Sequence, residues 1–176
     1  MKRLLLALVL GTGPAAAQMS HDQHMSHMAA QMGLTEPGQS AFGAIAEIVA
    51  RLESDPATDW SRVDIPALRA HLVDMDRVTL WSNVETETTA TGAIFTVTGT
   101  GDTVGSIRRM AHAHAGMMEG DWHYTVTDID AGASVTVAVP EADRPKLRGL
   151  GFFGIMASGM HHQMHHWMLA TGVNPH

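Results

Sequence analysis

The spacing of apolar residues first indicates helices. In residues 42–52, and again from about residue 65 to residue 75, apolar side chains recur every three or four positions. This spacing places them on one face of an α-helix, where they can pack against a core. Asp55-Pro56 ends the first of these segments, because proline cannot continue a helix. We therefore expect two helices at the start of the folded region.

Beyond these helices the apolar positions alternate with polar ones, which is typical of half-buried β-strands. The expected strands are residues 78–87, 93–98, 122–128 and 134–139. Turns that contain glycine join them into two hairpins, and a helical pattern follows each hairpin, over residues 102–118 and residues 143–170. The sequence thus predicts an α+β fold. In it, duplicated β-β-α units form an antiparallel four-stranded sheet with helices packed on one face, preceded by the two N-terminal helices.

The first residues predict export. Met1-Lys2-Arg3 is basic, an apolar run of about 7 residues follows, and Ala15-Ala16-Ala17 matches the cleavage pattern of a signal peptidase. The run is much shorter than the about 20 apolar residues that span a bilayer, and no later stretch is long enough either. We expect a cleaved signal peptide at residues 1–17, a periplasmic location and no membrane span.

The remainder of the chain divides into a tail and a domain. Residues 18–37 consist largely of Met, His, Ser, Gln and Ala, and they contain little that could pack in a core. Residues 38–176 have the usual size of one domain. We expect a flexible Met/His-rich tail followed by a single α+β domain that ends in a long C-terminal helix.

Charge and composition narrow the set of functions. The formal net charge is −7, and it becomes −9 when Lys2 and Arg3 leave with the signal peptide. Such an acidic chain argues against nucleic acid as a partner. The chain has no cysteine but 12 His and 13 Met. A metal would therefore be bound without thiolates, through imidazole and thioether groups that survive an oxidising compartment better.

The expected C-terminal helix carries the densest group of candidate ligands. Each helical residue advances by about 100°, so residues four apart lie nearly in line. One such line, which neighbouring aromatic residues mark as the inward face, contains Met156, Met160, Met164 and Met168. His161 and His165 lie at its edge, whereas His166 lies towards the opposite side, as does His162. The metal ligands expected on this helix are His161, His165, Met160, Met164 and Met168. Core packing is the alternative for the methionines.

The helix expected over residues 102–118 repeats this combination. Its candidate ligands share about a third of the circumference, and they are Met110, His114, Met117 and Met118. His112 points the opposite way. Two helices from equivalent units could build one metal site between them, although His114 could instead be a hydrogen-bonded core residue. His71 and Met75, four apart on the second N-terminal helix, could add to this site, but core packing is the favoured interpretation of His71.

The type of ligand indicates the metal. Thioether is a soft, neutral donor that favours Cu(I), while imidazole also accepts Cu(II) and Zn(II). The predicted cofactor is copper, with Cu(I) favoured and Cu(II) or Zn(II) left open. Imidazole binds a metal only in its neutral form, so affinity should fall as the pH drops through about 6.5.

The tail resembles a known class of proteins. Its tract Met19-Ser20-His21-Asp22-Gln23-His24-Met25-Ser26-His27-Met28 is similar to the Met/His-rich tracts of periplasmic copper-resistance proteins. In that group, such tracts gather copper in the cell envelope, for sequestration or for transfer to other proteins. The resemblance is confined to this tract. It implies another envelope copper protein as a partner besides the metal ion, and copper binding by His21, His24, Met25, His27 and Met28.

An enzyme is not expected. His161 and His165 have the spacing of a zinc-protease helix, but His162 occupies the position of the required general-base glutamate. The expected function is that of a periplasmic copper-binding protein, acting in copper buffering, resistance or delivery. Two alternatives stay open. One is a non-metal module that binds an apolar ligand or a partner protein through a Met-rich groove, and the other is a haem or copper redox enzyme with His/Met ligation.

Overall fold

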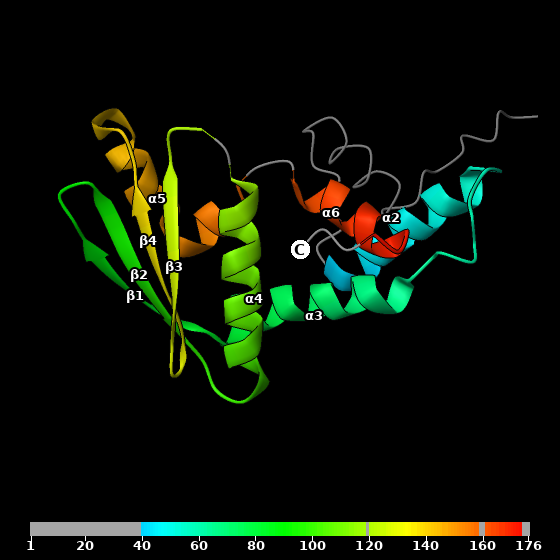
Figure 1. Ribbon diagram of the computed structural model, residues 1–176, viewed down its shortest axis with the longest axis horizontal. Coiled ribbons are helices and arrows are strands. Elements are labelled where there is room, and N and C mark those ends of the chain that lie inside the picture. Colours follow the sequence, from blue (N-terminus) through cyan, green and yellow to red (C-terminus); the bar gives the residue numbers. More distant parts are fainter. Residues whose placement is uncertain (1–39, 119, 159–160, 174–176) are drawn as a thin grey trace, which may run out of the picture. The chain divides into compact units, whose positions relative to one another are not determined.

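The computed structural model describes residues 40–118, 120–158 and 161–173, with the side chains of residue 40 and residues 161–164 excepted (Figure 1). These residues belong to a compact unit that extends from Pro37 to His176. The predicted signal peptide and tail, residues 1–37, lie outside the described residues. The ligand candidates that lie there are His21, His24, Met25, His27 and Met28. Within the described ranges, no helix is long and apolar enough to cross a membrane.

Four strands form one antiparallel sheet. They are β1 (Asn83–Thr88), β2 (Gly92–Thr98), β3 (His123–Ile129) and β4 (Gly132–Ala138). Their order in the sheet is β1-β2-β4-β3, so the two hairpins join through their second strands, and β1 and β3 form the edges. The predicted α+β class with an antiparallel four-stranded sheet is confirmed.

The two central strands begin with glycines in equivalent positions. A Cβ added to Gly92, the first residue of β2, would meet the carbonyl oxygen of Val137. A Cβ added to Gly132, the first residue of β4, would meet the carbonyl oxygen of Val97 in the same way. Only glycine permits so close an approach of two backbones. The two hairpins therefore approach each other closely at both ends of the β2–β4 pair, and Gly132 has in addition a positive φ of 159°.

A helix follows each hairpin and packs on the sheet. α4 (Asp102–Met117) contacts β3 and β4 along most of its length, and α5 (Arg144–Met156) contacts β2 (Figure 1). Alternate residues of β2 and β4 are buried, as the pleat of a sheet with one covered face requires. They form one core with the inward residues of both helices, which includes Phe95, Val97, Val135, Val137, Ile107, Leu147, Phe152 and Ile155.

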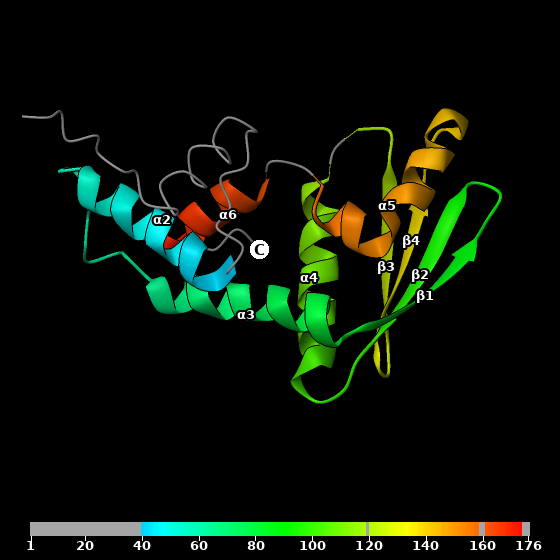
Figure 2. The same ribbon diagram turned by 180° about the vertical axis from the view of Figure 1, so that it is seen from behind.

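Three further helices form a second core. They are α2 (Ser40–Ser54), α3 (Ile65–Trp81) and α6 (His161–Ala170). Their buried residues are Ala44, Ile48, Leu52, Leu68, Leu72 and Ala170. α3 starts in this core and ends in the other one, because Val78 belongs to the core between the sheet, α4 and α5, while Met75 packs against both cores. Figures 1 and 2 show α3 reaching from α2 and α6 to α4.

The prediction of strand for residues 78–81 is wrong, because these residues form the last turn of α3. The β-branched pair Val78-Thr79 favours a strand locally. Val78 nevertheless continues the helical spacing of Leu72 and Met75, and only 4% of its surface is exposed. The hydroxyl of Ser82 donates to the carbonyl oxygen of Val78 at 2.6 Å and so ends the helix there.

The prediction of one long C-terminal helix is also wrong. α5 ends at Met156 and α6 begins at His161. Within α5, Gly151 already has φ 58° and ψ −169°, values that only glycine adopts readily. Ser158, whose hydroxyl bonds to the carbonyl of Gly154 at 2.7 Å, follows the end of α5. The four methionines spaced four residues apart therefore do not form one continuous line.

A candidate metal-binding site

A small cavity lies where α3, α4, α5 and α6 meet. Its volume is about 10 Å³, which is room for one water molecule or one metal ion. The residues that line it are His71, Met110, Ala113, His114, Met117, Met156 and His165. Six of these seven residues carry an imidazole or a thioether. We call this space the histidine cavity.

α4 supplies three of these side chains from a single face. Met110, His114 and Met117 are four and three residues apart, so they fall on one side of the helix. Met110 is 7% exposed and His114 is 4% exposed, and the ring of His114 stands edge-on to Tyr124 at a centroid distance of 5.6 Å. Burial also raises the pKa of the Tyr124 hydroxyl above its usual range. These positions agree with the face that the sequence pattern predicts.

Met118, the fourth candidate on this helix, does not line the cavity. It is the residue after α4, its backbone is extended, and its N–H donates to the carbonyl oxygen of His114 at 3.2 Å. The backbone of Met118 thus ends α4 with a hydrogen bond to the backbone of His114, a candidate ligand. Because α4 stops at Met117, the helical wheel on which Met118 was placed does not extend to this residue.

α3 and α6 supply the other two imidazoles. The rings of His71 and His165 lie with their centroids 4.4 Å apart and their planes inclined by 34°. His166 is also buried, and its ring stands edge-on to His71 at 5.5 Å. The prediction that His166 faces away from the core is therefore wrong. α6 is a separate short helix that contacts both α2 and α3, so more than one of its sides is covered.

The other methionines and histidines of the C-terminal segment lie in different places relative to the cavity. Met156 lines the cavity because it is the last residue of α5. Met168 is half-buried in α6 and does not line the cavity. Met160 lies outside the described residues, as do the side chains of His161 and Met164.

The donor set is mixed in its chemistry. In the part of the chain that the structure describes, no three His, Asp or Glu side chains lie close enough together to hold a metal ion by themselves. An ion in the histidine cavity would therefore combine imidazoles with thioethers from Met110, Met117 and Met156. Neither Asp nor Glu lines the cavity. Such a set is soft and neutral, which favours Cu(I) over Zn(II) and excludes Mg²⁺ or Ca²⁺.

A polar clamp fixes α3 against α4 beside the cavity. The guanidinium of Arg109 donates from Nε and from a terminal nitrogen to the two carboxylate oxygens of Asp74, each at 2.8 Å. The hydroxyl of Ser106 donates to the same carboxylate at 2.7 Å. Burial alone would raise the pKa of Asp74, but these hydrogen bonds and the charge of Arg109 outweigh it and hold that pKa below its usual range. The clamp thereby joins α3 to α4, the helices that carry His71 and Met110.

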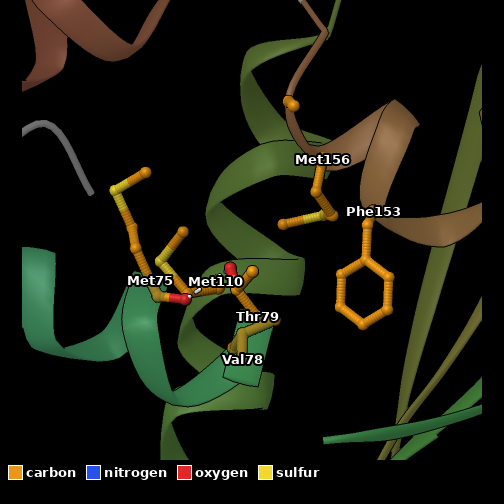
Figure 3. A pocket seen from close by; sticks show the side chains of 7 residues that line it. Met75, Val78, Thr79, Met110, Phe153 and Met156 are labelled. Carbon is orange, nitrogen blue, oxygen red and sulfur yellow. Dashed lines mark hydrogen bonds between the residues drawn. The ribbon is translucent and has the colours of Figure 1, made fainter. Parts of the chain in front are cut away.

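A groove adjoins the histidine cavity and opens to the surface. Its volume is about 220 Å³. It is lined by Met75, Val78, Thr79, Met110, Phe153, Met156 and Ala157. Figure 3 shows its three methionines coming from three helices, α3, α4 and α5, with Phe153 next to Met156. Met110 and Met156 line both the groove and the cavity. We call this space the methionine groove.

The sequence pattern gives too little weight to three of these residues. It favours core packing for His71, offers Met75 only as a possible addition, and leaves Met156 out of the expected ligands. The available signal is the combination of His71 and Met75, four residues apart on a helix whose buried residues are Leu68, Leu72 and Val78. The contact that brings His71 against α6 joins segments far apart in the sequence, so local spacing could not reveal it. No protein-family model, curated protein or solved structure matches this chain.

Proposed function

We propose that this protein binds copper, as Cu(I), in the histidine cavity, and that it acts as a periplasmic binding protein in copper buffering, resistance or delivery rather than as an enzyme. The observation that carries this proposal is the convergence of three imidazoles and three thioethers, from four helices, on a space of single-ion size. The signal-like residues 1–17 support the location, and the Met/His-rich tract supports a role in gathering copper and passing it to another envelope copper protein.

Core packing explains this arrangement less well. Methionine alone is a good filler of irregular gaps. Imidazole, however, costs free energy when it is buried, compared with an apolar side chain of the same volume. A core that needed only volume would therefore favour Leu or Phe at positions 71, 114 and 165. The joint placement of His and Met on one cavity is what metal ligation requires.

A Cu(I) competition titration against a chromophoric chelator, under reducing conditions, tests the proposal. The chain should start at residue 18, with every Met and His of residues 18–33 replaced by Leu or Asn, so that the tail does not mask the cavity. We expect saturable Cu(I) binding, and weaker Zn(II) binding in a parallel titration. His114→Leu should lower the Cu(I) affinity by at least the about tenfold that is lost when even an outer partner of a metal ligand is removed.

The matched control is His112→Leu. His112 lies on the same helix two residues earlier, but it is exposed and pairs with Asp128 at 3.0 Å. Its replacement should leave Cu(I) affinity unchanged. Wild-type affinity in both His114→Leu and His165→Leu would show that the cavity is packing and not a site.

The methionine groove favours a second candidate function. Its apolar lining and the exposed Phe153 would suit an apolar ligand or a side chain of a partner protein. This second function is favoured if the titration shows no Cu(I) binding by residues outside the tail.

A further inference from the structure

The methionine groove has a ligand chemistry of its own. Its metal-binding atoms are the thioethers of Met75, Met110 and Met156, and neither imidazole nor carboxylate lines it. Met75 belongs to this groove and not to the histidine cavity, whereas Met117 and the imidazoles belong to the cavity alone. Two donor sets therefore lie side by side and share Met110 and Met156.

The groove is accessible, and its wall is uncharged. Met75 and Met156 are partly exposed, and Phe153, at 42% exposure, stands at its edge. Val78 and Ala157 add apolar wall, and the hydroxyl of Thr79 donates to the backbone carbonyl of Met75 at 2.8 Å. An uncharged thioether wall offers nothing to a hard, strongly hydrated divalent ion, which requires oxygen ligands. It does offer ligands to a soft monovalent ion.

We propose that the methionine groove is a second metal site, specific for soft monovalent ions such as Cu(I) and Ag(I), through which the ion enters the histidine cavity. The entry role rests on the proposed function of the cavity, while binding in the groove stands on its own residues. An ion held by Met75, Met110 and Met156 can exchange Met75 for an imidazole and keep the other two sulfurs. Transfer inward then never requires the ion to lose all of its ligands at once.

The two sites differ in the residues on which they depend. The thioether of Met75 lines the groove and not the cavity, whereas the imidazoles of His71, His114 and His165 line the cavity and not the groove. Substitution of Met75 therefore alters the groove alone, and substitution of His114 or His165 alters the cavity alone.

The test is a titration with Ag(I), which has the soft monovalent character of Cu(I). The same tail-substituted chain is titrated with His114→Leu and His165→Leu added, which removes two imidazoles from the cavity and leaves the three thioethers of the groove. Because the two sites share Met110 and Met156, we expect one bound Ag(I) ion per chain, held in the groove. Met75→Leu, which keeps the side-chain volume, should then weaken this binding at least about tenfold.

The control variant is Met168→Leu, which alters a half-buried methionine of α6 that lines neither space. It should keep the Ag(I) binding. Methyl-labelled methionine NMR gives a readout that alters no residue of the groove. In the chain with His114→Leu and His165→Leu, Ag(I) should shift the methyl signals of Met75, Met110 and Met156 and leave that of Met168 in place.

The outcomes separate the two proposals. Ag(I) binding that Met75→Leu leaves unchanged in this chain, or the absence of any shift at Met75, overturns the groove site and leaves the cavity standing. Ag(I) binding that Met75→Leu weakens, together with a Cu(I) affinity that neither His114→Leu nor His165→Leu lowers, supports the groove as a metal site but overturns its role as an entrance, together with the cavity. Binding of an apolar probe in place of Ag(I) would make the groove an apolar-ligand site.

Discussion

α4 and the segment formed by α5 and α6 each follow a β-hairpin, yet they bring their side chains to the histidine cavity in different ways. α4 is one regular helix, in which Gly105 and Gly116 keep helical backbone angles. The second segment is bent at Gly151 and interrupted after Met156. As a result, α4 presents its candidate ligands from a single face, whereas the second segment supplies Met156 and His165 from two helices. The comparison teaches that two successive strand-strand-helix units can line one cavity asymmetrically when only one of their helices is broken.

The largest effect is expected from substitution of the glycine that begins the second strand of each hairpin. Gly92→Ala and Gly132→Ala each place a Cβ against a backbone carbonyl oxygen of the partner strand. We expect Gly92→Ala to destabilise the fold by about 3 kcal/mol, the upper end for an overpacked position. Gly132→Ala should cost more, because the backbone of Gly132 also has a positive φ of 159°. Urea unfolding measures both losses. Gly116→Ala, whose Cβ meets nothing within 4 Å, serves as control and should be neutral or stabilising. A negligible loss at either Gly92 or Gly132 would show that the close backbone contact there is not required.

The break in the second segment is tested at Gly151. Gly151→Ala introduces no clash, because its Cβ would meet nothing within 4 Å, but φ 58° with ψ −169° suits only glycine. We expect a loss of about 1–3 kcal/mol in unfolding free energy, and weaker Cu(I) binding because Met156 is displaced. Gly149→Ala lies in the same helix without a positive φ and should cost nothing. Equal stabilities of the two variants would mean that this bend is not required.

The clamp between α3 and α4 should give the smallest effect. Asp74→Asn removes the charge partner of Arg109, and because Arg109 is 61% exposed at its side chain the expected loss is only about 1 kcal/mol. The folded pKa of Asp74 is below its ordinary value of 3.8. Its contribution is therefore complete well above pH 3.8 and is lost as the pH falls through the folded pKa.

Unfolding of wild type and Asp74→Asn over a range of pH checks this prediction. The difference between them should be constant near neutral pH and should vanish in strong acid. Asp128→Asn, at a 51% exposed carboxylate beside His112, is the comparison variant and should show a smaller difference. A difference that grows in acid would contradict the assigned direction of the pKa shift.

The sheet and α4 could be predicted because their signals are local. Val135 and Val137 alternate with polar neighbours, and Met110 and His114 recur at helical spacing, so a short window of sequence suffices. The end of α3 could not be predicted, because the burial of Val78 in the core shared with α4 and α5 overrides its preference for a strand. The break after Met156 was hidden because the methionine spacing suggests a continuous helix across it.

The sequence predicts the chemical type of the side chains in the candidate site, but it does not predict every residue that lines it. The sequence pattern placed His114, Met110, Met117 and His165 among the ligands, and all four line the histidine cavity. His71 could not be assigned, because its neighbour His165 is far away along the chain and reaches it only when α6 folds back on α3. Which of two inward residues becomes a ligand depends on such long-range contacts.

α3 has its first half in one core and its last turn in the other, and the histidine cavity lies beside the point where it passes between them. An ion bound there stabilises only conformations in which both cores are intact. Backbone amides of α2 and α6 should then exchange with solvent by local opening in the empty protein, and by global unfolding in the loaded one. A bound metal ion would thus couple the unfolding of the two cores, and its presence could be recognised from the cooperativity of unfolding alone.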